Sequence, residues 1–225
     1  MDTKVKIIDV KESFLANNDA DADKLRMELK ADKTFYVNIM SSPGSGKTTT
    51  LLETLARIKD DLRAGVIEAD IDSDVDAKTI MEKAKVPAIQ VHTGGMCHLD
   101  ADMSRQGLRE IGTENLDIVF LENVGNLVCP AEFDTGANLN VVILSVPEGH
   151  DKPLKYPLMF EKADVVLINK IDASPAFNFD FDKVKEYIAM RSQKAPVFAI
   201  SAATGKGMDE WCTYLTEQAG KWLEA

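Results

Sequence analysis

Lys47 and Thr48 follow a short loop with two glycines, and residues of these types in this order could bind a phosphate group. The run Ser41-Ser42-Pro43-Gly44-Ser45-Gly46 comes immediately before them. Gly44 and Gly46 allow the backbone to curl so that successive N–H groups point inward at one anion. Lys47 would reach the β- and γ-phosphates of a nucleotide, and the Thr48 hydroxyl would ligate Mg²⁺.

The surroundings of this loop favour a phosphate-binding role. Residues 35–40 have the composition of a β-strand, and residues 48–60 repeat leucines at helical spacing, which gives the required order of strand, loop and helix. Ser41 stands where the usual G-x-x-x-x-G-K-S/T pattern has its first Gly, and the turn survives if the φ angle of Ser41 is negative. The alternative is an ordinary Gly/Ser turn. The residues expected to contact the phosphates are Ser42, Gly44, Ser45, Gly46, Lys47, Thr48 and Thr49.

A second motif indicates which base is bound. Asn169-Lys170-Ile171-Asp172 follows the apolar run 165–168 and is similar to the N-K-x-D motif of GTPases. The Asp172 carboxylate can accept hydrogen bonds from both N1–H and the 2-amino group of guanine, which adenine cannot offer. Ser201 and Ala202, after the last predicted strand, resemble the segment whose backbone N–H contacts the guanine O6. The alternative is a turn at a strand end with an exposed Asp.

The magnesium side of the site is less regular. Glu122-Asn123-Val124-Gly125 follows the predicted strand 117–121, in place of the D-x-x-G segment of Ras-like GTPases. Glu122 can hold Mg²⁺ directly or through water, and with Lys47 and Thr48 it forms the predicted catalytic set. Asp70 and Asp76, in the acidic run after the second strand, are further candidates for Mg²⁺. A solvated acidic loop is the alternative for that run.

Two cysteines and a histidine indicate a second site. Cys97 and His98 are adjacent and follow two glycines, at the predicted start of a helix over residues 97–111, which would place Asp102 on the same helix face as His98. Cys129 lies seven residues after Glu122. Two thiolates, an imidazole and a possible carboxylate suit Zn²⁺ or Ni²⁺ rather than Mg²⁺ or Ca²⁺. The alternative is that the cysteines are core residues, and Cys212 is assigned to the core.

Composition limits the classes of partner. The chain has 225 residues and a formal charge of −11, which argues against nucleic acid or an anionic membrane surface as partner. No apolar run has the length of a membrane span, and no secretory signal is recognisable, so we expect a cytoplasmic protein. Three cysteines in such a chain indicate thiols or metal ligands rather than a disulfide framework.

The pattern of apolar runs predicts an α/β fold. Seven short apolar runs alternate with helical patterns, which is typical of a mostly parallel sheet of about seven strands flanked by helices, as in P-loop NTPases. We expect a single domain over residues 1–225, with residues 1–33 as a helical extension. The predicted strands are 35–40, 64–70, 87–92, 117–121, 140–146, 163–168 and 196–200. The predicted helices are 13–30, 48–60, 75–85, 97–111 and 208–222.

Several segments resemble those of the HypB family, the nickel-insertion GTPases of nickel–iron hydrogenase maturation. They are residues 42–48, 93–101, 122–130 and 148–157. The resemblance implies a GTPase that works as a homodimer and binds Ni²⁺ or Zn²⁺ through Cys97, His98 and Cys129. It also implies a companion nickel-maturation protein and a hydrogenase large-subunit precursor as partners. The Cys-rich and His-rich N-terminal motifs of some relatives are absent. Some relatives have His at the position of Asp102, so a fourth protein ligand stays open.

Three other interpretations remain at this point. A urease-type nickel-maturation GTPase shares the fold and the cargo, but the Cys-Pro-His triplet of those proteins is absent here. A regulatory GTP-binding switch would use Cys97 and Cys129 as structural or redox thiols. A nucleoside kinase also has a phosphate loop, but its lid arginines are not recognisable and the motif at residues 169–172 would be unexplained.

Overall fold

A computed structural model describes residues 10–70 and 75–224, apart from the side chains of residues 10–14 and 75–78. Seven strands form one sheet in the order β3-β2-β4-β1-β5-β6-β7, and every pair of neighbours is parallel. The strands are β1 (Phe35–Ser41), β2 (Ala64–Asp70), β3 (Ala88–His92), β4 (Ile118–Glu122), β5 (Leu139–Ser145), β6 (Val165–Asn169) and β7 (Val197–Ala199). The predicted parallel α/β fold is confirmed.

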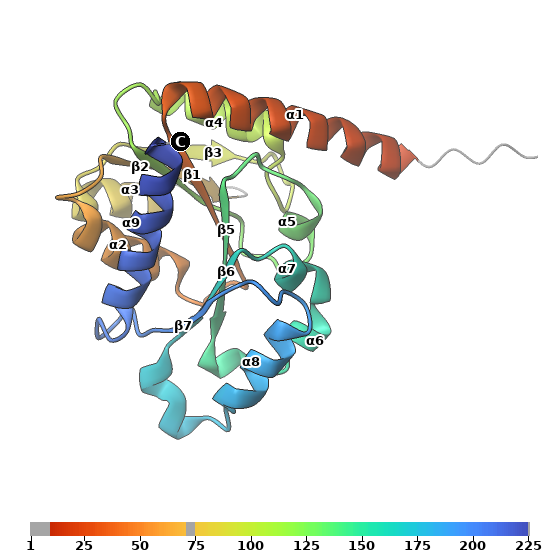
Figure 1. Ribbon diagram of the computed structural model, residues 1–225, viewed down its shortest axis with the longest axis vertical. Coiled ribbons are helices and arrows are strands. Elements are labelled where there is room, and N and C mark those ends of the chain that lie inside the picture. Colours follow the sequence, from red (N-terminus) through yellow and green to blue (C-terminus); the bar gives the residue numbers. More distant parts are fainter. Residues whose placement is uncertain (1–9, 71–74, 225) are drawn as a thin grey trace, which may run out of the picture.

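Helices connect the strands and cover both faces of the sheet (Figure 1). The longer helices are α1 (Val10–Asp32), α2 (Lys47–Ile58), α3 (Val75–Ala84), α4 (Ala101–Ile111), α8 (Phe181–Ala189) and α9 (Met208–Glu224). The short ones are α5 (Cys129–Glu132), α6 (Lys152–Lys155) and α7 (Pro157–Glu161), with 3-10 turns η1 (Val146–Glu148) and η2 (Ile171–Ala176). Among the described residues, no helix is both long enough and apolar enough to cross a membrane.

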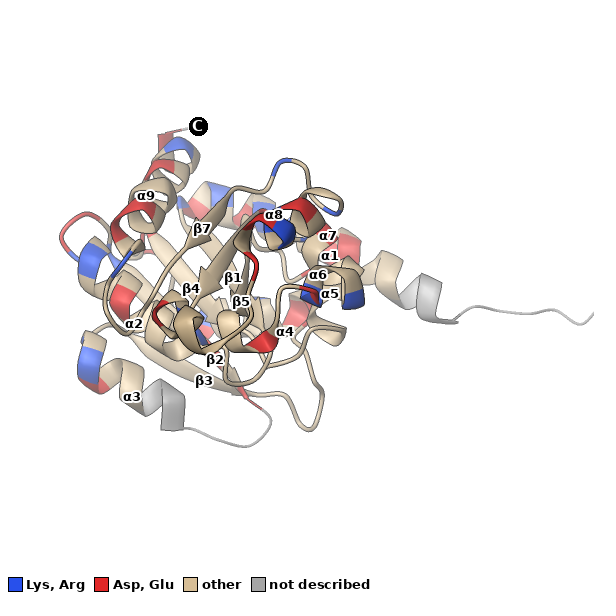
Figure 2. Cartoon of the chain, turned by 90° about the horizontal axis from the view of Figure 1, so that it is seen from below, with Lys and Arg blue, Asp and Glu red and all other residues tan. Residues whose placement is uncertain are grey.

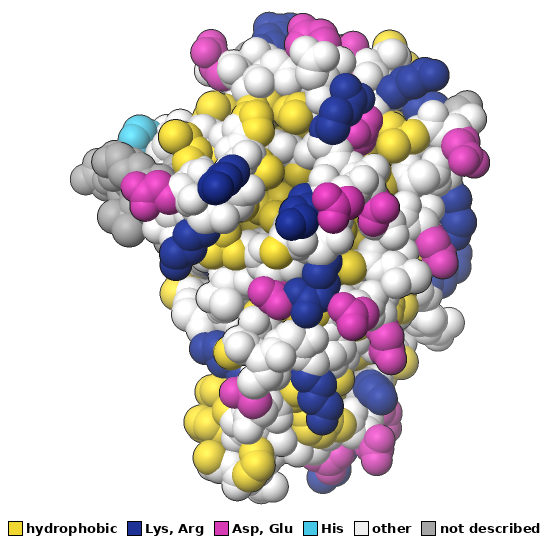
Figure 3. Space-filling model, turned by 90° about the vertical axis from the view of Figure 1, so that its left-hand side faces the viewer, with side chains coloured by type: hydrophobic (Ala, Val, Ile, Leu, Met, Phe, Trp, Pro, Cys, Tyr) yellow, Lys and Arg dark blue, Asp and Glu magenta, His cyan; other side chains and the backbone are white. Residues whose placement is uncertain are grey.

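The core lies on both faces of the sheet because side chains alternate along each strand. Phe35, Val37 and Ile39 of β1 pack with α2, α3 and α9 on one face. Tyr36 of β1 packs with α1 and α4 on the other face, and Met40 packs there with α7 and α8. Charged residues lie mainly on the helices and loops around the sheet (Figure 2). On the face to the left of Figure 1, acidic and basic groups alternate with hydrophobic ones (Figure 3).

The strand predictions are confirmed to within two residues at each end, but two features of the helices differ. The helix predicted over residues 97–111 begins at Ala101, because the Asp100 side chain caps it by accepting a hydrogen bond from the Met103 N–H. Cys97 and His98 therefore lie in the loop before the helix. Helix α8 was not predicted. The short helices α5, α6 and α7 were not predicted either, because each spans only four or five residues.

Parallel strands bring their C-terminal ends to one edge of the sheet, and the residues singled out above lie along that edge. Asp70 ends β2, Glu122 ends β4 and Asn169 ends β6. Because β4 and β5 flank β1 on either side, the loop after β1 lies between the segments that follow Glu122 and those that follow β5 and β6. The fold therefore places the phosphate loop at the centre of this edge.

Candidate functional site

The loop between β1 and α2 has the backbone of a phosphate-binding loop. Gly44 and Gly46 have φ angles of 74° and 97°, which residues with a Cβ atom rarely adopt. The described non-glycine residues with positive φ are Lys33, Lys85 and Lys170, so Ser41 meets the condition that its φ stay negative. The Ser45 hydroxyl donates a hydrogen bond to the Ser41 hydroxyl at 2.5 Å, which ties the two ends of the turn together.

A cavity of about 550 Å³ opens above this loop, within the range of small-molecule sites. The start of helix α2 faces it, and the unpaired N–H groups of a helix start favour a bound anion. The loop residues in its wall are Pro43, Gly44, Gly46, Lys47, Thr48 and Thr49. Asp70, Glu122, Val124, Gly125 and Lys170 complete the wall. The cavity is thus basic on the loop side and acidic on the side of β2 and β4.

The acidic side contains the residues expected to hold magnesium. The Thr48 hydroxyl donates a hydrogen bond of 2.7 Å to the Glu122 carboxylate, which is 2% exposed. Asp70 lines the same cavity. The side chain of Asp76 lies outside the described residues. A hydroxyl, a buried carboxylate and a second carboxylate around one cavity are oxygen donors of the kind that Mg²⁺ prefers, so these residues fit a Mg²⁺–nucleotide complex.

Asn169 connects three segments around the site. Its side-chain amide donates to the Ser45 carbonyl at 2.9 Å and to the Thr50 hydroxyl at 3.3 Å. Its carbonyl accepts a hydrogen bond of 3.1 Å from the Ala202 N–H. Asn169 therefore holds the phosphate loop, helix α2 and the 201–207 loop together.

The predicted base-binding residues surround a second, smaller cavity. It has a volume of about 200 Å³ and is lined by Gly46, Thr49, Asn169, Lys170, Asp172, Ala173, Ala202 and Ala203. The Ser201 hydroxyl donates to the Asp172 carboxylate at 2.6 Å, and the Lys170 ammonium donates to the Gly44 carbonyl at 2.6 Å. The bond from Ser201 orients Asp172. The side chain of Lys170 reaches from the segment after β6 to the phosphate loop.

Cys97, His98 and Cys129 lie together although His98 and Cys129 are 31 positions apart in the sequence. One ligand atom of each lies within 4.8 Å of the others, and all three residues are half-buried. The loop before α4 supplies Cys97 and His98, and Cys129 begins α5. Among the His, Cys, Asp and Glu side chains of the described residues, these three form the group that is close enough together to hold one metal ion. Two thiols and an imidazole suit Ni²⁺ or Zn²⁺.

The surroundings of His98 also fit a metal ligand. Its ring stacks on Phe133 with centroids 3.7 Å apart, and its Nδ1 atom is buried without a hydrogen-bond partner in the protein. Burial lowers the pKa of His98, although Asp100 and Glu132 act in the opposite direction, and the neutral imidazole is the form that binds metals. A hydrogen bond with Cys97 raises the pKa of Cys129, as do burial and the proximity of the other thiol.

Asp102 lies apart from these three residues. It is in the first turn of α4, its side chain is 70% exposed, and it accepts a hydrogen bond from Gln106 at 2.8 Å. The expectation that it shares a helix face with His98 was wrong, since His98 precedes the helix. Cys212, in contrast, is in the core as predicted, and burial raises the pKa of its thiol to about 11.

Comparison with known protein families shows which family this chain belongs to. Residues 35–199 match the CobW/HypB/UreG nucleotide-binding domain. The chain belongs to the CobW/HypB/UreG family. The match begins at the first residue of β1 and ends at the last residue of β7, so it covers the whole sheet, the phosphate loop and the Cys97, His98 and Cys129 cluster, and it stops just before the 201–207 loop.

The curated relatives within this family narrow the resemblance to HypB. The hydrogenase maturation factor HypB of Escherichia coli is 44% identical over 213 residues, covering 95% of this chain and 73% of that protein. The hydrogenase/urease maturation factor HypB of Helicobacter pylori is 42% identical over 217 residues, covering 95% of this chain and 88% of that protein. The resemblance to HypB noted in the sequence is confirmed.

Solved structures of HypB have the same fold. HypB from Helicobacter pylori in complex with nickel aligns with a TM-score of 0.84 and 41% identity, covering 91% of this chain and 96% of that one. HypB from Archaeoglobus fulgidus aligns with a TM-score of 0.83 and 36% identity, covering 91% and 99%. The P-loop NTPase fold of the CobW/HypB/UreG family is therefore confirmed for this chain.

Two residues of this HypB-like site were not predicted. Phe133 stacks on His98, and Gly125 packs so closely on the phosphate loop that an added Cβ would lie 3.1 Å from the Pro43 Cα. Both contacts join segments far apart in sequence, so a local pattern does not reveal the partner. The glycine between Glu122 and Cys129 was the available signal for the second contact.

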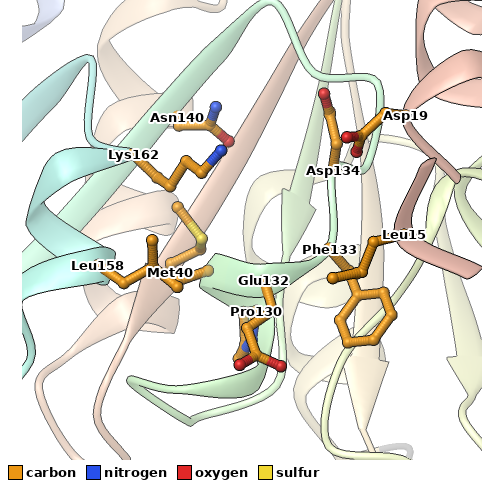
Figure 4. Close-up of a pocket in the computed structure, with 11 residues that line it drawn as sticks. Leu15, Asp19, Met40, Pro130, Glu132, Phe133, Asp134, Asn140, Leu158 and Lys162 are labelled. Atoms are coloured by element: carbon orange, nitrogen blue, oxygen red, sulfur yellow. The ribbon is translucent and has the colours of Figure 1, made fainter. Parts of the chain in front are cut away.

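A further cavity is lined in part by the residues that follow Cys129 (Figure 4). It has a volume of about 330 Å³. Leu15 and Asp19 of α1 contribute to its wall, as do Leu158 and Lys162 at the α7 side. Its remaining wall is Met40, Asn140 and residues 130–134, which include Phe133. Phe133 therefore contacts both the cluster, through His98, and this cavity.

Proposed function

We propose that this protein is a GTP-hydrolysing nickel metallochaperone that inserts nickel into the large-subunit precursor of a nickel–iron hydrogenase. The observation that carries the proposal is that ligand atoms of Cys97, His98 and Cys129 lie within 4.8 Å of one another. Cys129 directly follows the short segment 123–128, and Val124 and Gly125 of this segment line the phosphate cavity. The names of its relatives, hydrogenase maturation factors of the HypB type, support the same function.

Guanine recognition rests on Asp172 and the 201–207 loop. The Ser201 hydroxyl fixes one oxygen of the Asp172 carboxylate, which leaves acceptor capacity for the N1–H and 2-amino groups of guanine. The Ala202 N–H is held near the base cavity by Asn169. An adenine would present an acceptor to the carboxylate at the same position, so the arrangement favours GTP and GDP over ATP.

Hydrolysis would use the phosphate cavity. Lys47 and the backbone N–H groups of the loop stabilise negative charge on the transferring phosphoryl group. Thr48, Glu122 and Asp70 would hold the Mg²⁺ of the nucleotide complex, with Asp76 as a further candidate, and the ion would supply positive charge to the phosphates. The segment after Glu122 carries Asn123 and no Gln, so a residue positioned to orient the attacking water is missing from it, and we expect slow turnover without a partner.

The metal site supplies three ligands per chain. A closed four-coordinate set needs one more, which a second copy of the chain or a water molecule would provide, because Asp102 lies apart from the cluster. In a homodimer with two-fold symmetry the same surface meets itself, so a ligand can be shared across the axis. Planar coordination would favour Ni²⁺ and tetrahedral coordination Zn²⁺, and we expect both ions to bind.

The nucleotide state would reach the metal through the segment 123–128. Gly125 lies against Pro43 of the phosphate loop, and Glu122, directly before the segment, accepts a hydrogen bond from Thr48. A GTP-dependent rearrangement of the phosphate loop would therefore displace this segment. Its displacement would move Cys129 relative to Cys97 and His98. By reciprocity, bound metal would change nucleotide affinity or dimerisation by the same free energy.

The protein would act in the cytoplasm, with a companion nickel-maturation protein as the second partner.

A second candidate function is delivery of nickel to urease. It is favoured by the name of the Helicobacter pylori relative, which is a hydrogenase/urease maturation factor. Both functions use the same nickel and nucleotide sites and differ in the recipient protein.

The test of the metal assignment is Ni²⁺ titration of the purified chain, followed by thiolate-to-nickel absorbance. We expect about one Ni²⁺ per chain, and at least a 10-fold loss of affinity in Cys97→Ser and Cys129→Ser. Cys212→Ser is the matched control, because that thiol is buried in the core away from the cluster. Nickel binding that survives both substitutions, or that Cys212→Ser alone removes, would contradict the assignment.

A further inference from the structure

Helices α2 and α9 follow the two loops that the nucleotide must bridge. The phosphate loop leads directly into α2, and the 201–207 loop leads directly into α9. The second loop is compact: the Ser201 N–H donates to the Lys206 carbonyl at 2.8 Å, and the Gly205 N–H donates to the Ser201 carbonyl at 2.8 Å. A displacement of α9 relative to α2 would therefore move Ser201 and Ala202 relative to the phosphate loop.

A buried hydrogen bond joins these two helices. The indole N–H of Trp211 on α9 donates to the Thr54 hydroxyl on α2 at 3.0 Å, and the Thr54 hydroxyl donates to the Thr50 carbonyl at 2.7 Å. The Thr50 hydroxyl accepts a hydrogen bond from the Asn169 side-chain amide. Asn169 also donates to the Ser45 carbonyl and accepts from the Ala202 N–H. Trp211, Thr50, Thr54 and Asn169 are each 2% exposed. The indole is thus the far end of a chain of contacts that leads to both nucleotide loops.

A second polar contact between α2 and α9 is at the surface. Arg57 donates to the Asp209 carboxylate at 2.9 Å, but the Asp209 side chain is 90% exposed. An exposed ion pair contributes little, whereas a buried indole N–H that loses its acceptor has no water to replace it. Of these two contacts, the one between Trp211 and Thr54 has the larger part in fixing how α9 sits on α2.

We propose that Trp211 and Thr54 are positioning residues for the nucleotide, because their hydrogen bond holds the phosphate loop and the guanine loop at the spacing that one GDP or GTP molecule needs. This inference rests on the proposed guanine-nucleotide function. A ligand that binds both loops gains from their fixed spacing, in the same way that a bivalent ligand gains from two correctly placed sites. A ligand that binds only one loop gains nothing from it.

The experiment compares three ligands in the full-length protein: GDP, which contacts both loops, guanosine, which contacts the base loop, and tripolyphosphate, which contacts the phosphate loop. Dissociation constants are measured by competition with a fluorescent GDP analogue. The variants are Trp211→Phe, which removes the donor and keeps an aromatic ring, and Thr54→Val, which removes the acceptor and keeps the shape. Thr54→Ser retains the hydroxyl and is the matched control.

We expect GDP affinity to fall about fivefold in Trp211→Phe and in Thr54→Val, the effect of about one net hydrogen bond. The affinities for guanosine and tripolyphosphate should stay within twofold of wild type, and Thr54→Ser should bind GDP like the wild type. The double variant should be no worse than either single one, since both remove the same bond. Trp211→Phe leaves no buried donor unpaired, so it provides the folded variant if Thr54→Val is unstable.

Unchanged GDP affinity in folded Trp211→Phe would overturn the inference. So would an equal loss of affinity for all three ligands, because that pattern indicates damage to the loops themselves rather than to their spacing. Failure of the wild-type protein to bind GDP is a separate result, and it would remove the proposed function instead.

Discussion

Replacing Gly46 by alanine tests how the phosphate loop and the guanine motif are joined. Gly46 has a φ angle of 97°, and a Cβ added there would lie 2.6 Å from the Asn169 side-chain nitrogen. Asn169 cannot move aside cheaply, because its amide is held by Ser45, Thr50 and Ala202. The substitution therefore combines an unfavourable backbone angle with overpacking against a fixed side chain.

The two costs can be separated. A positive φ in a residue with a Cβ costs about 1–2 kcal/mol, and overpacking of a filled site costs about 1–3 kcal/mol. Gly46→Ala should therefore lower the free energy of unfolding by about 2–5 kcal/mol, out of the about 5–15 kcal/mol typical of a domain. Gly44→Ala is the matched control, because its φ is 74° but no atom lies within 4 Å of the added Cβ. It should cost only the first part, about 1–2 kcal/mol.

The assay is urea unfolding of the nucleotide-free proteins, with GDP affinity measured on each. In Gly46→Ala/Asn169→Ala, the loss should be smaller than the sum of the two single losses, because the second change removes the atom that clashes. Equal losses in Gly44→Ala and Gly46→Ala would refute the reasoning, since the contact with Asn169 would then contribute nothing.

Three further predictions concern the base, the phosphates and pH. Asp172→Asn should weaken GTP binding and favour xanthosine nucleotides, because one acceptor becomes a donor; equal wild-type affinity for ATP and GTP would contradict this. Lys47→Ala should abolish GTP turnover, measured as phosphate release, and unaltered turnover would contradict the assignment of the loop. Arg63 lowers the pKa of Asp117 by hydrogen bonding, so this pair stabilises the fold above the ordinary pKa of about 3.9 and loses that effect as pH falls below it. Asp117→Asn should therefore show a shallower loss of stability in acid unfolding, and an unchanged slope would contradict it.

The sequence was sufficient to predict the sheet and the loops on it. Each strand is short, apolar and followed by a turn, and the parallel arrangement then places the strand ends on one edge. For this reason Lys47, Glu122 and Asn169 could be assigned to one site before any coordinates. The start of α4 was misplaced because Cys97 and His98 follow two glycines, whereas the true cap is Asp100, a residue type that prefers that position.

What the sequence could not indicate are contacts between distant segments. The stacking of Phe133 on His98, the approach of Gly125 to Pro43 and the hydrogen bond from Trp211 to Thr54 each depend on how packed elements meet. Helical periodicity identified α9 as amphipathic, but no pattern in it distinguishes a tryptophan that fills the core from one that also donates to α2. These contacts connect the candidate nucleotide and metal sites to the rest of the fold.

Nickel binding in each nucleotide state tests whether the nucleotide changes the metal site. Ni²⁺ is titrated into the full chain without nucleotide, with GDP and with a non-hydrolysable GTP analogue, while sedimentation velocity follows the oligomeric state. We expect nickel affinity to differ about 10-fold between the GDP and GTP states, a coupling of about 1.4 kcal/mol, together with a shift between monomer and dimer. Identical nickel affinity and identical sedimentation in all three states would contradict the account.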